Sequence, residues 1–284
     1  MAQEFLRLIA ACYTKHMIIA VDTGGTKTLV AAFTKNGESI AEVKFATPRD
    51  VHEYLSHLTE TITELAQDKE LKAITVALPG RVRSDGVLVS ARNLCWKEVN
   101  LKQHLTRHFT CPIFIENDAN LGGLGAVNLL GETPSRCLYI TVSTGIGTGM
   151  IVDGVLLDGM EQCEGGQMML EHDGIIKTWE SFASGRAIYD TYKKFARDIT
   201  SKRVWNVISK NIAQGLLALW PVLRPEMIIV GGSIGTYFDR YGEQLNGILR
   251  EYLGYRAPLV VQSPRPEEVV IYGCYYYAID RLAS

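Results

Sequence analysis

The 284-residue sequence lacks several features that mark metal-bound, exported or membrane-embedded proteins. Its six cysteines, at positions 12, 95, 111, 137, 163 and 274, include no Cys-x-x-Cys pair, which argues against a cysteine zinc site or a redox dithiol. No apolar run approaches the roughly 20 residues that are needed to span a bilayer. The sequence therefore predicts a cytoplasmic protein with reduced thiols and no membrane contact.

The chain also lacks a strong charge of either sign, because 29 basic and 31 acidic residues leave a formal net charge of −2. Such a chain offers no basic field for nucleic acid and no run of like charges for a polyelectrolyte partner. Its 47% hydrophobic content is ordinary for a soluble enzyme and is enough for a sizeable core. A small molecule is therefore the expected ligand, and nucleic acid is not.

Three glycine-rich segments are what the sequence does have, and each follows an apolar run typical of a buried strand. The segments read IIAVDTGGTK at residues 18–27, LYITVSTGIGTG at 138–149 and MIIVGGS at 227–233. Glycine lets a backbone approach a phosphate and point N–H groups at it, while threonine hydroxyls and a lysine add donors. Together the segments indicate one nucleotide site to which distant parts of the chain contribute.

The common phosphate-loop motifs do not fit these segments. The second segment lacks the Gly-Lys-Ser/Thr ending of a Walker loop, and an Asp-Gly hairpin turn at 153–154 follows it where a dinucleotide fingerprint needs a helix. Asp22 ends the first strand, where its carboxylate could hold Mg²⁺ directly or through water. Taken singly, each segment is also compatible with a hairpin turn that needs glycine and binds no ligand. Asp22 is likewise compatible with a strand-end residue that caps such a turn.

Asp118, which lies between the first two glycine segments, is the candidate catalytic base. It belongs to the run ENDAN at residues 116–120, after an expected strand and before an expected helix over 119–130. Phosphoryl transfer to an alcohol needs alignment, charge neutralisation and a base that takes the hydroxyl proton. The alternative for Asp118 is a helix N-cap, although Asn117 or Asn120 could share that role.

The segment 158–177 is expected to be irregular. Glu164 and Glu180 lie in or beside it among small or turn-forming residues. They could accept hydrogen bonds from sugar hydroxyls, or they could be solvated surface carboxylates. Trp96 and Trp179 could form the walls of such a site.

Hydrophobic periodicity predicts an α/β chain in which strands and helices alternate. Apolar residues recur at helical spacing over 50–68, and the last segment has the apolar density of a helix that docks on the core. The order of elements repeats after Cys137 without a repeat of sequence. We expect an N-terminal extension at 1–16, with Met17 as an alternative start, an N-terminal domain at 17–123 completed by a helix at 272–283, and a C-terminal domain at 124–271.

Taken together, these segments resemble the ROK family of sugar kinases and repressors, within the actin-like ATPase superfamily that includes the hexokinases. The resemblance covers nearly the whole chain from Met17 and depends on seven segments in the order of the family. They are DTGGTK at 22–27, PGRV at 79–82, NLCW at 93–96, ENDAN at 116–120, STGIGTG at 143–149, ESFASG at 180–185 and VGG at 230–232.

The resemblance implies two ribonuclease-H-like domains, each with a mixed sheet, and a central cleft that holds ATP and Mg²⁺. It implies a glucokinase-like kinase in which Asp118 is the general base toward a hydroxyl, most economically the 6-hydroxyl, of a hexose or N-acetylhexosamine. The expected nucleotide contacts are Asp22, which also serves the metal, Gly24, Gly25, Thr26, Lys27, Thr144, Gly145, Gly147, Gly231 and Gly232. The implied sugar contacts are Gly80, Arg81, Asn93, Asn117, Asp118, Glu164, Gln167 and Glu180. Related kinases are often dimers, so a homodimer is expected.

The chain departs from the family pattern in one region. Where most members have Gly-Glu-x-Gly-His, it has EGGQ at 164–167, and residues 168–178 replace the cysteine-rich zinc loop. The family histidine ligates zinc and touches sugar, so Gln167 could keep a hydrogen bond but not the metal. His172 has no histidine or cysteine partner at a metal-ligand spacing, so no structural zinc is expected. The identity of the sugar stays open.

Two alternatives to an ATP-dependent kinase remain. The first is a sugar-sensing regulator without catalysis, because the family includes repressors. Only 16 residues precede the first expected strand, too few for a helix-turn-helix domain, but a regulator that acts through a protein partner escapes this objection. The second keeps the kinase and uses polyphosphate as the phosphoryl donor.

Overall fold

The computed structural model describes residues 16–67, 69–83, 85–91, 94–131, 133–157, 159–160 and 163–283. The chain divides into two compact units: the first ends at Leu121 and includes the last segment from Val270, and the second runs from Gly122 to Val269. The expected extension, apart from His16, lies outside the described residues, and so does the predicted sugar contact Asn93. In the part of the chain that is described, no helix combines the length and apolar character needed to cross a membrane.

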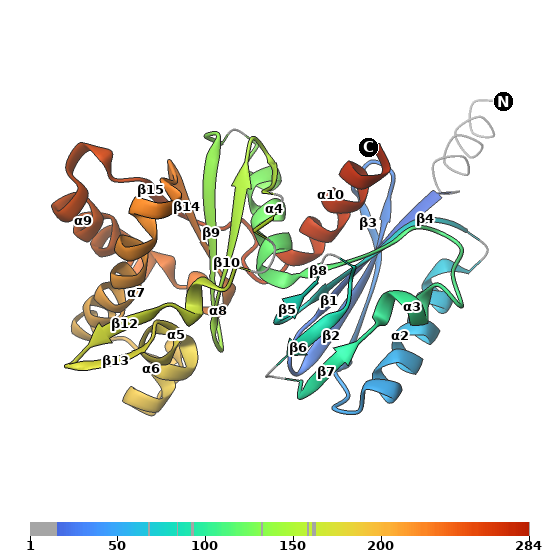
Figure 1. The fold of residues 1–284 in the computed structure, drawn as a ribbon, viewed down its shortest axis with the longest axis horizontal. Coiled ribbons are helices and arrows are strands. Elements are labelled where there is room, and N and C mark those ends of the chain that lie inside the picture. The colour runs from blue at the N-terminus through green and yellow to red at the C-terminus, as the bar shows by residue number, and fades with distance from the viewer. Residues whose placement is uncertain are drawn as a thin grey trace. The chain divides into compact units, whose positions relative to one another are not determined.

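The first unit is built on a five-stranded sheet of order β3-β2-β1-β4-β8 (Figure 1). β1 (His16–Thr23), β2 (Lys27–Thr34) and β3 (Ser39–Ala46) form an antiparallel meander, and β4 (Glu70–Leu78) and β8 (Ile113–Asn117) extend the sheet in parallel from β1. The apolar runs of β1, β2 and most of β4 are buried, as expected for strands covered on both faces. At the edge of the sheet, β3 alternates exposed and half-buried residues.

Helix α2 (Val51–Ala66) shows how local sequence sets the boundaries of an element in this unit. The Asp50 side chain accepts hydrogen bonds from the backbone N–H groups of His52 and Glu53 and so begins the helix. The apolar residues that predicted the helix from their spacing, such as Leu58, are buried in the core that includes β1, β2 and β4.

Two further helices and a small sheet complete the description of the first unit. α3 (Leu101–Leu105) precedes β8, and α10 (Val269–Ala283) is the C-terminal helix. β5 (Arg81–Val82), β6 (Leu88–Ala91) and β7 (Trp96–Val99) form a three-stranded antiparallel sheet. β7 begins at Trp96, the last residue of the NLCW segment at 93–96.

The second unit has its own five-stranded sheet with the same arrangement, β11-β10-β9-β14-β15. β9 (Arg136–Val142), β10 (Ile146–Val152) and β11 (Val155–Leu156) form the antiparallel meander, and β14 (Met227–Gly231) and β15 (Leu259–Gln262) extend it in parallel. A meander followed by two parallel strands therefore occurs twice. The finding confirms the α/β fold with one mixed sheet in each half and the repeat of topology without sequence.

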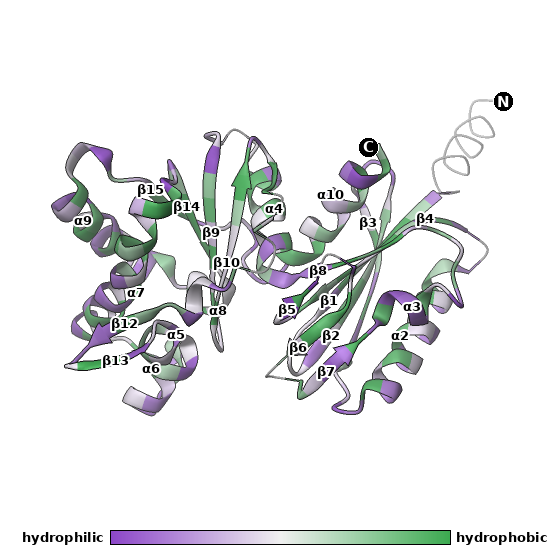
Figure 2. Cartoon of the chain, in the orientation of Figure 1, coloured by the Kyte–Doolittle hydropathy of each residue, from purple (hydrophilic) through white to green (hydrophobic). Residues whose placement is uncertain are grey.

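The helices of the second unit pack around a core that contains residues from β9, β10 and β14. They are α5 (Glu180–Ala183), α6 (Gly185–Tyr192), α7 (Lys202–Leu223), α8 (Gly232–Gly235) and α9 (Gly242–Leu253), and α4 (Asp118–Leu130) crosses from the first unit into the second. Figure 2 shows hydrophobic stretches in strands of both five-stranded sheets, and both hydrophobic and hydrophilic residues on the helices.

The expectation that residues 158–177 are irregular was wrong for the second half of that segment. β12 (Met169–His172) and β13 (Ile175–Thr178) form an antiparallel hairpin. Its turn is Asp173-Gly174, with φ of +54° and +78°, the two positive values that a type I′ turn requires. An Asp-Gly pair between short apolar stretches is a hairpin signal, so the sequence contained the information that was missed.

Candidate active site

The first glycine segment forms the turn between β1 and β2. The Gly24 N–H donates to the Lys27 carbonyl at 2.9 Å and closes the turn, and a Cβ on Gly24 would lie 2.9 Å from the same oxygen. Gly25, Thr26 and Lys27 are exposed. The turn therefore presents backbone and a lysine to solvent, and its narrowest point requires glycine.

Asp22 is half-buried near the end of β1, directly before this turn. Burial raises the pKa of its carboxyl to about 6, because the charged form is poorly solvated there. Among the described residues, no group of three or more His, Cys, Asp or Glu side chains could hold a metal by itself. A single strand-end carboxylate fits Mg²⁺, which proteins often bind through one or two carboxylates together with substrate phosphates.

Tyr54 of α2 supports the strand end beside Asp22. Its hydroxyl and the Thr23 hydroxyl are 2.6 Å apart and both side chains are buried. Burial raises the pKa of Tyr54, so the phenol stays protonated and can donate this hydrogen bond. Sequence reasoning did not identify this contact, which joins residues 31 positions apart.

Asp118 is the first residue of α4 and follows β8 directly. Asn117 caps the helix, because its Oδ1 accepts from the backbone N–H groups of Ala119 at 2.8 Å and Asn120 at 3.1 Å. The Asp118 Oδ1 accepts from the same Ala119 N–H at 2.8 Å. Asn117 therefore makes two of the capping hydrogen bonds and Asp118 shares one of them, and the catalytic role of Asp118 stays a prediction.

Two predicted sugar contacts of the first unit, Gly80 and Asn117, are joined directly. The Asn117 Nδ2 donates to the Gly80 carbonyl at 2.8 Å. Gly80 has a φ of +96°, and a Cβ there would clash with the carbonyl oxygen of Ser90. Arg81, the next residue, is exposed at the start of β5. Gly80, Asn117 and Asp118 therefore form one cluster at the carboxyl ends of β4 and β8.

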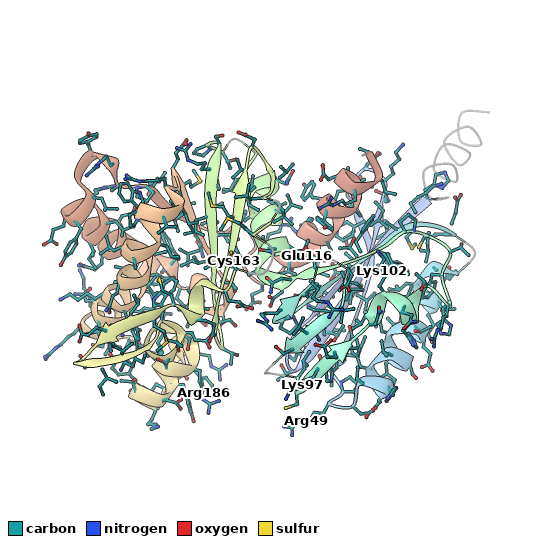
Figure 3. All side chains as sticks on the ribbon, in the orientation of Figure 1. Arg49, Lys97, Lys102, Glu116, Cys163 and Arg186 are labelled. Carbon is teal, nitrogen blue, oxygen red and sulfur yellow. The ribbon has the colours of Figure 1, made fainter. Side chains whose placement is uncertain are left out.

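Glu116 is a buried carboxylate that sequence reasoning named only as part of the ENDAN run (Figure 3). Its Oε1 accepts from the Asn117 N–H at 2.7 Å and from the Asn120 Nδ2 at 3.0 Å. Because both donors belong to the start of α4 or its cap, Glu116 holds the segment that carries Asp118. A buried glutamate beside two asparagines was the available signal.

The second and third glycine segments lie together in the second unit. The loop between β9 and β10 is closed by the Ser143 N–H, which donates to the Gly145 carbonyl at 2.9 Å. The Ser143 hydroxyl lies 3.5 Å from that of Ser233, the last residue of the third segment. A Cβ on Gly231 would clash with the Tyr139 ring, and one on Gly232 would lie 2.7 Å from the Val142 carbonyl. The close packing of β14 and α8 on β9 therefore requires both glycines.

Glu164, Gln167 and Glu180 are half-buried in the second unit. The Gln167 Nε2 donates to Glu180 Oε1 at 2.6 Å, and the Ile146 N–H donates to Glu180 Oε2 at 3.4 Å. Glu164 directly precedes the 3₁₀ turn η1 (Gly165–Gln167). Glu180 is therefore a bonded carboxylate and not a solvated surface group.

The expectation that Trp96 and Trp179 form walls of a site was wrong. Trp96 is 4% exposed and Trp179 is 0% exposed, so neither ring can face a ligand. The Trp96 Nε1 donates to the Arg49 carbonyl at 2.8 Å, and the Trp179 Nε1 donates to the Asn211 carbonyl at 3.0 Å. Both indole N–H groups donate to backbone carbonyls, which is the usual condition for a tryptophan in a core.

His172 stabilises the β12–β13 hairpin through contacts that involve no metal. Its ring stacks on Phe182 with centroids 4.0 Å apart, and its Nδ1 is 3.2 Å from the Gln214 Oε1. The Lys177 Nζ lies 5.7 Å from the same Phe182 ring. These side chains hold the segment that stands in place of the zinc loop.

Three curated proteins illustrate what the chain is similar to. A glucokinase from Thermotoga maritima is 26% identical over 319 residues, with 95% of this chain and 99% of the relative covered. A fructokinase from Lactococcus lactis subsp. cremoris is 25% identical over 235 residues, covering 76% and 78%. A xylose repressor from Caldicellulosiruptor bescii is 25% identical over 258 residues, covering 76% of this chain and 64% of the repressor.

Solved structures share the fold. A ROK family glucokinase from Streptomyces griseus, in complex with glucose and AMPPNP, superposes with a TM-score of 0.79 at 21% identity over 93% of this chain and 99% of that one. An inorganic polyphosphate/ATP-glucomannokinase from Arthrobacter sp. strain KM gives a TM-score of 0.72 at 24% identity, covering 94% and 99%. The sequence profile of the ROK family matches residues 18–267. The resemblance seen in the motifs is thereby confirmed, and the chain belongs to the ROK family.

Proposed function

We propose that the protein is an ATP-dependent sugar kinase that transfers a phosphoryl group to a hydroxyl, most economically the 6-hydroxyl, of a hexose or N-acetylhexosamine. The observation that supports this most is the arrangement at the start of α4. Asn117 caps the helix and Glu116 accepts hydrogen bonds from Asn117 and Asn120, which fixes the segment that carries the proposed base Asp118 at the carboxyl end of β8. The names of the glucokinase and fructokinase relatives agree with this chemistry.

The nucleotide side of the reaction is assigned to the three glycine segments. In the first unit, Gly24, Gly25, Thr26 and Lys27 would contact phosphate oxygens of ATP, with Asp22 toward the metal. In the second unit, Thr144, Gly145 and Gly147 would face phosphates, and Gly231 and Gly232 would lie by the adenosine. Mg²⁺, when bound with ATP, supplies charge neutralisation on the transferred group.

A sugar is an uncharged polyol, so we assign its contacts to groups that accept or donate hydrogen bonds. In the first unit these are Gly80, Arg81, Asn93 and Asn117, with Asp118 as general base for the reacting hydroxyl. In the second unit they are Glu164, Gln167 and Glu180. The resemblance to the family pattern places Gln167 where most members have a histidine, so Gln167 is the residue that would set this chain's sugar preference.

The test is a coupled assay of ADP release with Mg-ATP against glucose, mannose, fructose, allose, N-acetylglucosamine and N-acetylmannosamine. Turnover with at least one sugar is expected, and Asp118→Asn should lower it by roughly 10²- to 10⁴-fold with a much smaller change in sugar affinity. Asp239→Asn, at an exposed position in the second unit, is the matched control. Turnover of the Asp118 variant within tenfold of the parent would contradict the assignment of the base.

Two other functions have support of their own. The xylose repressor among the relatives favours a sugar-sensing regulator, which would bind a sugar without releasing ADP. The glucomannokinase, which is named for both polyphosphate and ATP, favours polyphosphate as the phosphoryl donor. A parallel assay with polyphosphate in place of ATP would detect this activity as the formation of sugar phosphate. We also expect a homodimer in the cytoplasm, and light scattering after size-exclusion chromatography measures the oligomeric state.

A further inference from the structure

The carboxylate of Glu180 is bonded in two directions within the second unit. Its Oε1 accepts from the Gln167 side chain at 2.6 Å, and its Oε2 accepts from the backbone N–H of Ile146 at 3.4 Å. Ile146 begins β10, immediately after the loop of the second glycine segment. One carboxylate therefore contacts both an assigned sugar group and the assigned phosphate loop.

The position of Gly145 shows independently how close the carboxylate lies to this loop. A Cβ on Gly145 would be 2.7 Å from Glu180 Oε2, a contact that real side chains do not make. A side chain at the loop tip would therefore fit only if the Glu180 carboxylate moved away from the loop. The negative charge of Glu180 occupies space directly beside the backbone where an anionic phosphate is expected.

The loop between β9 and β10 is held on both sides by hydrogen bonds. The contact between Glu180 and this loop is therefore part of the packing of the second unit. The Gly185 N–H donates to the Ser143 carbonyl at 2.7 Å, which ties the α5–α6 junction to the loop. The Gly165 N–H donates to the Thr148 hydroxyl at 3.1 Å, which ties η1 to β10. Glu180, Gln167 and the loop are therefore held together by backbone contacts around them.

We infer that Glu180 couples the binding of the two substrates. Without sugar, its carboxylate holds the phosphate loop in a form that binds nucleotide weakly, and a bound sugar releases the loop by hydrogen bonding to that carboxylate. This inference rests on the proposed function. A carboxylate beside the loop repels phosphate and shares an N–H that phosphate would use. Sugar hydroxyls donate hydrogen bonds to the carboxylate, compete with the Ile146 N–H for it and draw it from the loop. Linkage then requires that nucleotide tightens sugar binding by the same factor.

Gln167 acts in this scheme as a positioning residue. Because a carboxylate is an acceptor only, the 2.6 Å contact places the Gln167 Nε2, and not its Oε1, toward Glu180. The amide donor keeps one carboxylate oxygen fixed while the other lies on the loop. Loss of this donor should leave Glu180 free to adopt other rotamers and so weaken the coupling.

The experiment is a calorimetric titration of the full chain with Mg-AMPPNP, alone and in saturating glucose, with a parallel titration in saturating fructose. For the parent protein, we expect a sugar that is turned over to tighten Mg-AMPPNP binding by about 5- to 150-fold, the usual range of coupling between sites. Glu180→Ala should bind Mg-AMPPNP more tightly than the parent in the absence of sugar, by a similar factor. Adding sugar to this variant should change its nucleotide affinity less than twofold.

Further variants separate the proposed role from a general loss of structure. Gln167→Leu should lower the sugar-dependent tightening, and Gln167→His, which restores a ring N–H donor, should recover it. Glu180→Gln keeps the shape and removes the charge, so it should also bind Mg-AMPPNP more tightly than the parent without sugar. Glu243→Gln, an exposed carboxylate of α9, is the control that should keep the parent's coupling.

The outcomes distinguish this inference from the proposed function. A folded Glu180→Ala protein that binds Mg-AMPPNP no tighter than the parent without sugar would overturn the inference, whichever sugar is the substrate. The parent protein could also turn over a sugar that does not change its affinity for Mg-AMPPNP. That result would overturn the inference and leave the kinase assignment intact. No Mg-AMPPNP binding by the parent or Glu180→Ala would overturn the proposed function itself.

Discussion

Replacing Asp22 by asparagine should make the folded protein more stable at neutral pH while it abolishes metal-dependent activity. Burial raises the pKa of Asp22 from 3.8 to about 6, which means that the folded state disfavours the charged carboxylate. The difference corresponds to about 3 kcal/mol of unfolding free energy. Asparagine has nearly the same shape and carries no charge, so the substitution should recover up to about that amount.

The sign and pH range follow from which state binds the proton. Between pH 4 and 6, the folded state holds the Asp22 proton and the unfolded state has released it, so the stability of the parent falls as the pH rises through this range. Above pH 6 the full penalty is present, and below about pH 4 both states are protonated and no penalty remains. The gain from Asp22→Asn should therefore be largest above pH 6 and vanish near pH 4.

The measurement is urea unfolding of parent and variant at pH 7.5 and pH 4 in EDTA, so that no divalent cation stabilises the parent carboxylate. Asp239→Asn serves again as an exposed control and should change the unfolding free energy by less than about 0.5 kcal/mol at either pH. Equal stability of Asp22→Asn and parent at pH 7.5 would refute the reasoning. An equal gain at both pH values would refute it as well, because the gain would then not come from the charge.

Three further outcomes are expected. Gly80→Ala should lower the unfolding free energy by about 2 kcal/mol or more, because φ is +96° there and a Cβ clashes with backbone; an unchanged melting curve would contradict this. Gly215→Ala should destabilise the second unit by about 2 kcal/mol in chemical denaturation, because its Cβ would overlap the Trp179 ring, and Gly247→Ala, with open space around it, is the matched control. A zinc-selective chelator should change neither turnover nor melting temperature, since His172 holds the hairpin by stacking; activity that is lost with chelator and restored by zinc would contradict this.

The spacing of apolar residues along the sequence predicted the strands and the helix that hold the site. β1 and β14 were recognisable because strands covered on both faces need unbroken apolar runs, and α2 because its buried face recurs with the helical period. The β12–β13 hairpin was missed although its turn is an Asp-Gly pair. The apolar residues on its two sides do not alternate with polar ones, and two of them, Ile175 and Ile176, are exposed.

The choice between roles of neighbouring residues could not be read from the sequence. Asp118, Asn117 and Asn120 are all good capping residues, and only the backbone at the end of β8 directs Asn117 to the helix N–H groups. Trp96 and Trp179 sit in polar surroundings in the sequence, yet both are buried by residues from elsewhere in the chain.

The sequence by itself determined the α/β elements, the family and the glycine segments, because these depend on residue type and short-range spacing. Only the tertiary structure decided which groups meet. The contact of Glu180 with Ile146 joins residues 34 positions apart, and that of Tyr54 with Thr23 joins residues 31 apart. Such pairs form when whole elements pack to bury apolar surface, and no local pattern encodes where two packed elements will bring their side chains together.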